Sequence, residues 1–155
     1  MKDLFIDNNV ARCFANPIDP EYKRLLAWLR RYDETSPLDC AHLVVSNKLI
    51  CEYMRTCQLS SSPTSIVAIV DMHTRQGRLQ KRSSKDIKEF RRVHYKPHVE
   101  KSLRCKGDDR DHVATVLMSF RKMALVRDKG LRHDINSFPG FRAIAVPRPQ
   151  DLDYD

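Results

Sequence analysis

The chain has 155 residues, of which 41% are hydrophobic and 31% are charged, a composition typical of one soluble globular domain. Apolar runs such as Ile66–Val70 are far shorter than the roughly 20 residues that a membrane-spanning helix needs. The N-terminus reaches an acidic residue at Asp7, too early for a secretory signal, and the five cysteines include no C-x-x-C pair. We therefore expect a cytoplasmic protein with free thiols and no membrane association.

Positive charge is concentrated in one segment of the chain. The formal net charge is +8, and the segment from Arg75 to Lys106 alone carries +9, while all other residues together carry −1. Such a one-sided excess favours a polyanionic partner over an ordinary solvated surface. Since Phe90 and Tyr95 are the only aromatic residues in this segment, contacts to phosphates are expected rather than stacking on bases.

The first half of the chain predicts two strands, each followed by a helix. Residues 4–6 form a short apolar run typical of a buried strand, and the i, i+3, i+4, i+7 spacing of apolar residues after Pro20 predicts a helix. A loop is expected around Ser36 and Pro37. Residues 42–45 predict the second strand, and Ser46 is the expected N-cap of the helix that carries Leu49.

In the second half, residues 63–104 predict mostly helix in two or three pieces, with breaks at Gly77 and Ser83. A short strand is expected at 102–105, a helix after Gly107, a strand at 123–126, a turn at 128–130 and a last strand at 141–146. Strands that alternate with helices predict an α/β fold, here a three-layer α/β/α sandwich around a mostly parallel sheet of four or five strands. We expect one domain over residues 1–147 and a flexible acidic tail over 148–155.

Acidic residues accompany the predicted strand ends. Asp7 follows the first strand, Glu52 lies in the helix after the second, Asp111 opens a later helix, and Asp128 follows the strand at 123–126. Each acid alone fits a capping, turn or surface role. The carboxyl ends of parallel strands, however, meet at one edge of a sheet, where several carboxylates repel one another unless a cation lies between them. A divalent cation bound by oxygen ligands is the expected solution.

These motifs, in this order, resemble the PIN-domain family, in particular the small prokaryotic ribonucleases of the VapC type. The segments that carry the resemblance are Leu4–Val10, Val44–Glu52, Asp111–Ala114, Leu125–Asp128 and Ala143–Pro147. The stretch from Asp128 to Asn136, which contains Asp134, is similar to the last acidic loop of that family. One departure is Arg127, which stands where the family usually has Thr or Ser.

The resemblance implies a PIN-like fold and a metal-dependent endoribonuclease that hydrolyses RNA phosphodiester bonds with Mg²⁺ or Mn²⁺ as cofactor. It assigns catalysis and metal binding to Asp7, Glu52, Asp111 and Asp128, and adds Asp134 as a further metal ligand. Asp108, Asp109 and Asp111 compete for the third acidic position, for which Asp111 is our choice and Asp109 the reserve. The implied partners are RNA, an antitoxin protein if the chain is the toxin of a toxin–antitoxin pair, and a second copy in a homodimer.

Basic residues around these acids are the expected contacts to the RNA backbone, because an acidic pocket by itself repels a polyanion. Some are close in sequence to the acids and others lie in the basic segment: Arg12, Lys81, Arg82, Arg91, Arg92, Arg127 and Lys129.

Two other functions remain open. The first is a PIN-like module that binds nucleic acid without cleaving it. The second is a phospho-acceptor receiver domain, which is also doubly wound but needs an acidic pair after its first strand, where Asp7 stands alone, and a Lys after its last strand, where none follows Val146. His94 and His98 have a spacing that can bind zinc, but Pro97 between them argues against a regular helix.

Overall fold

The computed structural model describes residues 1–15, 17–57 and 62–155, and for Cys57 the backbone alone. The strands of these ranges are β1 (Lys2–Ile6), β2 (Ala41–Ser46), β3 (Leu79–Arg82), β4 (Met123–Leu125) and β5 (Ile144–Val146). The helices are α1 (Asn8–Ala11), α2 (Pro20–Arg30), α3 (Asn47–Cys57), α4 (Ile66–Arg75), α5 (Ser84–His94), α6 (Pro97–Ser102), α7 (Asp109–Leu117) and α8 (Lys129–Ser137), with short 3₁₀ helices at Pro37–Asp39 (η1) and Pro149–Asp151 (η2). No described helix is long and apolar enough to cross a bilayer.

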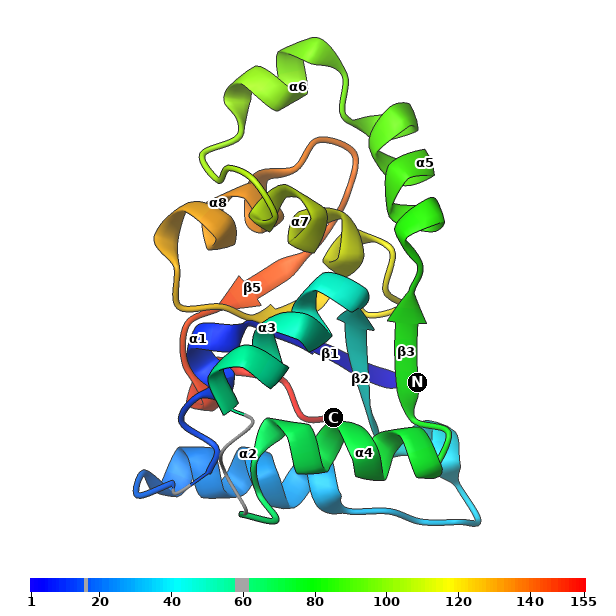
Figure 1. Cartoon of the computed structure of the whole chain (residues 1–155), viewed down its shortest axis with the longest axis vertical. Coiled ribbons are helices and arrows are strands. Elements are labelled where there is room, and N and C mark those ends of the chain that lie inside the picture. The colour runs from blue at the N-terminus through cyan, green and yellow to red at the C-terminus, as the bar shows by residue number, and fades with distance from the viewer. Residues whose placement is uncertain (16, 58–61) are drawn as a thin grey trace.

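The strands form one five-stranded parallel sheet in the order β3-β2-β1-β4-β5. α2 and α4 pack together on one side of the sheet, and α7 and α8 pack together on the other side (Figure 1). The fold is therefore an α/β/α sandwich, which confirms the predicted fold class. α5 and α6 extend beyond the sheet on the side of α7 (Figure 1).

Three segments differ from the sequence prediction. Residues 79–82, predicted within a mostly helical stretch, form the edge strand β3, because their backbone pairs with β2 although L-Q-K-R lacks an apolar alternation. The strand predicted at 102–105 is wrong, since the amides of Arg104 and Cys105 donate to the carboxylate of Asp134 instead of to a neighbouring strand. The turn predicted at 128–130 is the start of α8, where the Asp128 side chain accepts a hydrogen bond from the Leu131 amide at 2.8 Å.

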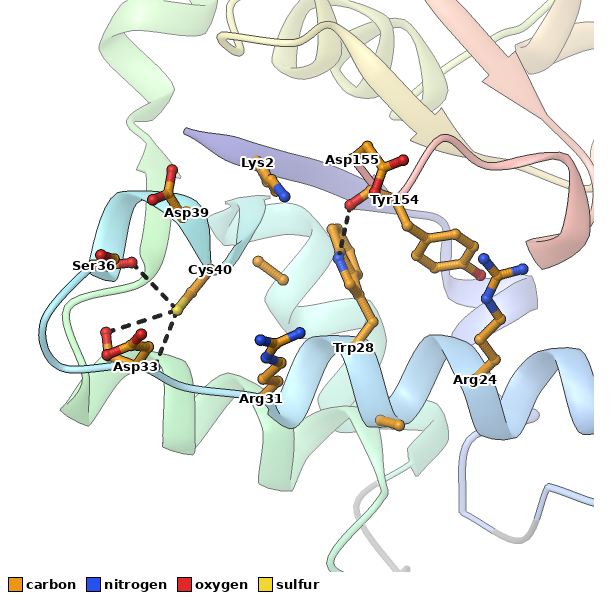
Figure 2. Close-up of a pocket in the computed structure, with 12 residues that line it drawn as sticks. Lys2, Arg24, Trp28, Arg31, Asp33, Ser36, Asp39, Cys40, Tyr154 and Asp155 are labelled. Carbon is orange, nitrogen blue, oxygen red and sulfur yellow. Dashed lines mark hydrogen bonds between the residues drawn. The ribbon is translucent and has the colours of Figure 1, made fainter.

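The C-terminal segment, which we expected to be a flexible tail, packs against α2. Pro149 and Leu152 are buried, and residues 149–151 form η2. The indole Nε1 of Trp28 donates to the carbonyl oxygen of Tyr154 at 3.2 Å, and the two rings meet edge to face at 5.3 Å (Figure 2). Buried apolar residues and the Trp28–Tyr154 contact place this segment, and Asp153 also pairs with Arg121 at 3.7 Å.

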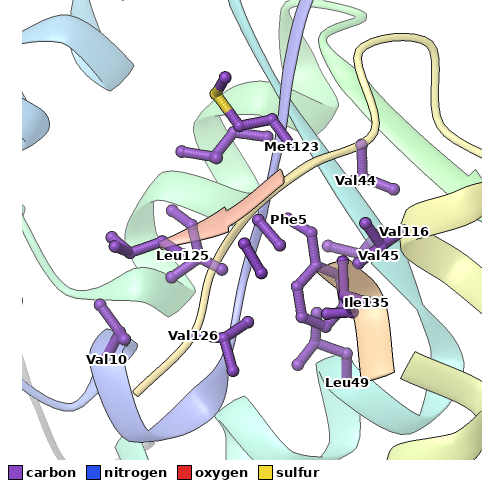
Figure 3. Packing of buried hydrophobic residues seen from close by; sticks show 14 of the residues in the cluster. Phe5, Val10, Val44, Val45, Leu49, Val116, Met123, Leu125, Val126 and Ile135 are labelled. Carbon is purple, nitrogen blue, oxygen red and sulfur yellow. The ribbon is translucent and has the colours of Figure 1, made fainter. Parts of the chain in front are cut away.

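The core lies on both faces of the sheet. β2 is buried along its whole length, as expected for a central parallel strand that reads as a continuous apolar run. Phe5 and Val45 from the sheet meet Leu49 of α3, Val116 of α7 and Ile135 of α8 (Figure 3). Close packing of these side chains fixes the strand ends and the adjoining helix starts relative to one another.

A fully buried arginine, Arg78, lies at the edge of the sheet where the parallel strands begin. Nη1 of Arg78 donates to the carbonyl oxygens of Leu29, Arg31 and Ala41 at 3.1, 3.3 and 2.8 Å, and Nε donates to Gln76 Oε1 at 2.9 Å. The guanidinium thus satisfies carbonyl groups at the end of α2 that have no partner within the helix. It joins α2 to the first residue of β2.

The Arg78→Met variant should lose about 3 kcal/mol or more of unfolding free energy, because buried carbonyl oxygens would lose their donor. Urea unfolding monitored by circular dichroism measures the change. Arg30→Met, which alters an exposed residue in the last turn of α2, is the matched control and should stay within about 0.5 kcal/mol of the parent. An unchanged midpoint for Arg78→Met would contradict this role.

His73 predicts a loss of stability in mild acid. It is fully buried in α4 and donates from Nε2 to the Leu29 carbonyl at 2.8 Å, and burial lowers its pKa from 6.5 to about 4. The unfolded chain therefore binds a proton more readily, so stability is fully present above pH 6.5 and is lost as the pH falls toward 4, by about 3 kcal/mol from this residue. His73→Gln should flatten unfolding free energy against pH in that window, and His98→Gln, at an exposed position, should not.

Candidate metal centre

Four acidic residues lie where the strands end and the following helices begin. Asp7 directly follows β1, Glu52 lies in the second turn of α3, Asp109 is the first residue of α7, and Asp128 caps α8 after β4. β1 and β4 are neighbours at the position where the order of strands reverses. Open parallel sheets bind their ligands at this kind of switch point, outside the carboxyl ends of the strands.

Asp7, Glu52 and His112 form the most compact part of this group. One carboxylate oxygen of each acid and one ring nitrogen of His112 lie within 4.8 Å of one another. His112 is fully buried against the Phe5 ring, and its Nε2 lies 3.0 Å from Glu52 Oε1. The imidazole therefore holds Glu52 toward Asp7.

α3 is tied to the end of β1 by two further side chains. The Tyr53 hydroxyl donates to the carbonyl oxygen of Ile6, the residue before Asp7. One turn of helix later, the Thr56 hydroxyl donates to Asn8 Oδ1 at 2.8 Å. Glu52 directly precedes Tyr53 and lies one helical turn before Thr56, so these contacts fix the backbone of Glu52 relative to Asp7.

The group carries uncompensated negative charge. Burial raises the pKa of Asp7, and the charges of Asp109 and Glu52 add to this effect, while His112 and the Asn8 amide oppose it. Burial also raises the pKa of Asp109, together with the charges of Asp128 and Glu52. Although burial disfavours protonated His112, the hydrogen bond and charge of Glu52 and the charges of Asp7 and Asp109 outweigh it and raise its pKa. Such an excess is what a bound cation relieves.

Asp111, our choice for the third acid, is not brought into this group. Its carboxylate accepts hydrogen bonds from Arg91 Nη1 at 2.7 Å and from Lys48 Nζ. Burial alone would raise its pKa, but these two cations lower it. Asp109, the reserve, instead interacts electrostatically with Asp7 and Glu52, and it shares one face of α7 with His112, three residues later.

Asp134 and Asp128 use their side chains to shape the backbone around the site. Asp134 is buried, and its two oxygens accept the amides of Arg104 and Cys105 at 2.8–3.0 Å, which leaves it no role in the acidic group. Asp128 uses Oδ1 to cap α8 but is otherwise exposed, and its charge acts on Asp109. Asp128 therefore belongs to the group, whereas Asp134 holds the backbone of Arg104 and Cys105.

The basic residues expected to contact RNA lie on segments that leave the same edge of the sheet. Arg12 ends α1, and α5 continues from β3 and projects beyond the sheet (Figure 1). All seven predicted residues are at least partly exposed: Arg12, Lys81, Arg82, Arg91, Arg92, Arg127 and Lys129.

A cavity of about 590 Å³ lies at the other edge of the sheet. It is bordered by Lys2 at the start of β1, Cys40 before β2, and Trp28 and Tyr154 (Figure 2). Since β1 and β2 begin there and end at Asp7 and Ser46, the cavity and the acidic group are separate features.

Sequence reasoning did not assign His112 to this group. The available signal was the pair Asp109 and His112 at helical spacing i, i+3, directly beside the expected acids. Comparisons with known proteins add no assignment: no family model, curated protein or solved structure matches the chain.

Two substitutions should change stability in opposite directions when the protein is kept free of metal with a chelator. Asp7→Asn should raise the unfolding free energy, because it removes a repelling charge. Asp111→Asn should lower it by about 1–2 kcal/mol, because it weakens two charge-assisted hydrogen bonds. Urea unfolding of both variants measures the effects, with the exposed Asp71→Asn as control. Destabilisation by Asp7→Asn would argue against a repulsive group.

Proposed function

We propose that the chain is a metal-dependent endoribonuclease of the PIN-domain type. The observation that carries this proposal is the cluster of Asp7, Glu52 and His112 at the switch point of a parallel sheet, on which the charge of Asp109 also acts. These acids come from the same successive elements as in the resemblance, with Asp109 in place of Asp111. Asp128 completes the set after β4.

The residues fit a divalent cation on the chemistry of their donors. Carboxylate oxygens are the ligands that Mg²⁺ and Mn²⁺ prefer. Burial, and then the charges of neighbouring acids, raise the pKa values of Asp7 and Asp109, and a bound cation would favour the ionised carboxylates. Asp7, Glu52 and Asp109 would hold the ion, and Asp128 has its Oδ2 available, since Oδ1 caps α8. When bound, the ion supplies electrostatic stabilisation of the phosphodiester and activation of water.

The remaining residues of the site orient and recognise. His112 keeps Glu52 in place through the 3.0 Å hydrogen bond, and its burial against Phe5 prevents the ring from turning toward solvent. Arg127 and Lys129 flank Asp128 and are exposed, where they can contact a strand that crosses the acidic group. The basic segment on β3 and α5 extends this surface and favours a polyanion as substrate.

The resemblance also implies a cellular role, which we include in the proposal. In that role the protein is cytoplasmic, acts as the toxin of a toxin–antitoxin pair, and has a cognate antitoxin and a second copy of itself as partners. Size-exclusion chromatography with light scattering measures the oligomeric state. To test the toxin role, the parent protein and the Asp7→Asn variant are expressed in cells. Growth should stop with the parent alone and resume when the neighbouring gene is expressed with it.

A PIN-like module that binds RNA without cleaving it is the alternative function. It is favoured by the departure at Arg127, a cation next to the acid that follows β4. The two functions differ in one measurement, since a binder leaves labelled RNA intact in the presence of Mn²⁺.

Mn²⁺ should raise the melting temperature of the protein, because an ion that binds the folded state alone stabilises it by mass action. The Asp7→Asn and Asp109→Asn variants should show a clearly smaller rise. Differential scanning fluorimetry, with Ca²⁺ as a second ion and Asp71→Asn as a control at an exposed carboxylate, makes the measurement. An equal rise in all variants would place the bound ion elsewhere on the protein.

Labelled single-stranded RNA should be cut by the parent protein with Mn²⁺ and remain intact with chelator. Asp7→Asn and Asp109→Asn should each abolish cleavage while leaving the circular dichroism spectrum unchanged, whereas Asp71→Asn should cut at the parent rate. Intact RNA with the parent protein, in spite of a metal-dependent rise in melting temperature, would instead support the binding module.

A further inference from the structure

α7 presents two acidic faces at the edge of the sheet. Asp109 and His112 lie three residues apart and turn toward Asp7 and Glu52. Asp108 and Asp111, also three apart, lie on an adjoining face of the helix and turn toward Lys48. The first face is the candidate metal centre, and the second is directly beside it.

On the second face, two cations cover one buried carboxylate. Asp111 is bonded by Lys48 from the first turn of α3 and by Arg91 from α5, the latter at 2.7 Å. The side chain of Asp111 is only 10% exposed, while those of Lys48 and Arg91 are 47% and 31% exposed. The carboxylate therefore lies beneath the two cations, which solvent reaches together with the more exposed acids Asp108 and Glu100.

Both cations keep hydrogen-bond donors that Asp111 does not use. Lys48 Nζ has three N–H groups and contacts Asp111 and, at 3.0 Å, the exposed Asp108. Arg91 has five and gives Nη1 to Asp111 and Nη2 to Glu100 at 3.4 Å, a long contact. An oxyanion can accept the remaining donors without breaking the bonds to Asp111.

The position of Lys48 connects this pair to the metal centre. Lys48 and Glu52 are four residues apart on α3 and therefore share one face of the helix. Asp111 directly precedes His112, whose ring holds Glu52. Lys48 and Asp111 thus lie on the same two helices as Glu52 and His112, α3 and α7, and Arg91 reaches Asp111 from α5.

We propose that Lys48 and Arg91 form a phosphate-binding pair for a nucleic-acid backbone, and that Asp111 is the positioning residue that holds both cations in place. The ligand is a phosphodiester adjacent to the one that meets the acidic group, so the inference rests on the proposed function. It gives Asp111 a role that differs from metal binding, and it adds Lys48 to the residues that contact the strand.

The test measures RNA affinity without catalysis. Binding of a labelled single-stranded RNA is followed by fluorescence anisotropy in the Asp7→Asn background, without divalent metal, over a series of salt concentrations. Lys48→Met and Arg91→Met should each weaken binding by about tenfold and reduce the slope of log affinity against log salt by about 0.7, the value for one lost phosphate contact on a single strand. Lys48→Arg should restore both quantities, because it returns a cation to the same position.

Arg75→Met is the matched control, because Arg75 forms a comparable ion pair with Asp71 at 2.7 Å on α4, far from the acidic edge. It should leave both affinity and slope unchanged. If circular dichroism shows that Lys48→Met is unfolded, Lys48→Gln replaces it, since the amide keeps a donor toward Asp111 without the charge. Parent-like affinity and slope for folded variants at both Lys48 and Arg91 would overturn the proposal and leave the pair as a structural link between α3, α5 and α7.

Inorganic phosphate, added at constant ionic strength, distinguishes a nucleic-acid backbone from a free oxyanion. If RNA stays bound in millimolar phosphate, the site prefers a nucleic-acid backbone. If phosphate displaces RNA from the parent protein but not from Lys48→Met, the site binds a free oxyanion instead, and the assignment to a nucleic-acid backbone is overturned. The result is also separable from the proposed function. If the protein neither binds metal nor cuts RNA, but its RNA affinity depends on Lys48, only the nuclease proposal is rejected. If it cuts RNA equally well without Lys48 or Arg91, only the phosphate-binding pair is rejected.

Discussion

Mutual repulsion among buried carboxylates is the constraint around which this edge of the molecule is organised. Asp7 and Glu52 lie close together beside His112, and burial makes the charges of Asp7 and Asp109 more costly than they would be in water. Only one buried imidazole, His112, offsets that charge from within the group. The tight packing of strands and helices prevents the acids from moving apart, so the group is preorganised for a cation.

The same helix separates two different electrostatic environments. On one face of α7 the acids raise one another's pKa values, and on the next face Lys48 and Arg91 lower the pKa of Asp111. Three Asp residues within four positions thus have different surroundings. Asp108 lies at the surface, the charge of Asp109 acts on the acidic group, and Asp111 binds Lys48 and Arg91. The two environments lie next to each other at the same edge of the sheet.

The segments that differ from the sequence prediction were placed by contacts distant in sequence. β3 has a polar sequence and becomes a strand because the free edge of β2 supplies backbone partners. The residues around Arg104 follow the carboxylate of Asp134 from α8. The C-terminal segment is ordered by Trp28 of α2 and Tyr154, and its acidic composition does not report this. Each of these outcomes depends on a partner that local patterning cannot reveal.

The sequence by itself determined the α/β class, the parallel sheet and the conclusion that Asp7, Glu52 and Asp128 come to one edge. It did so because apolar periodicity identifies strands and helices, and parallel connections force their ends together. Only the tertiary structure showed that Asp111 binds Lys48 and Arg91, that Asp134 accepts the backbone amides of Arg104 and Cys105, and that His112 contacts Glu52. In a helix each residue turns the side chain by about 100°, so a shift of one or two positions selects a different face. That phase is fixed by packing in the core.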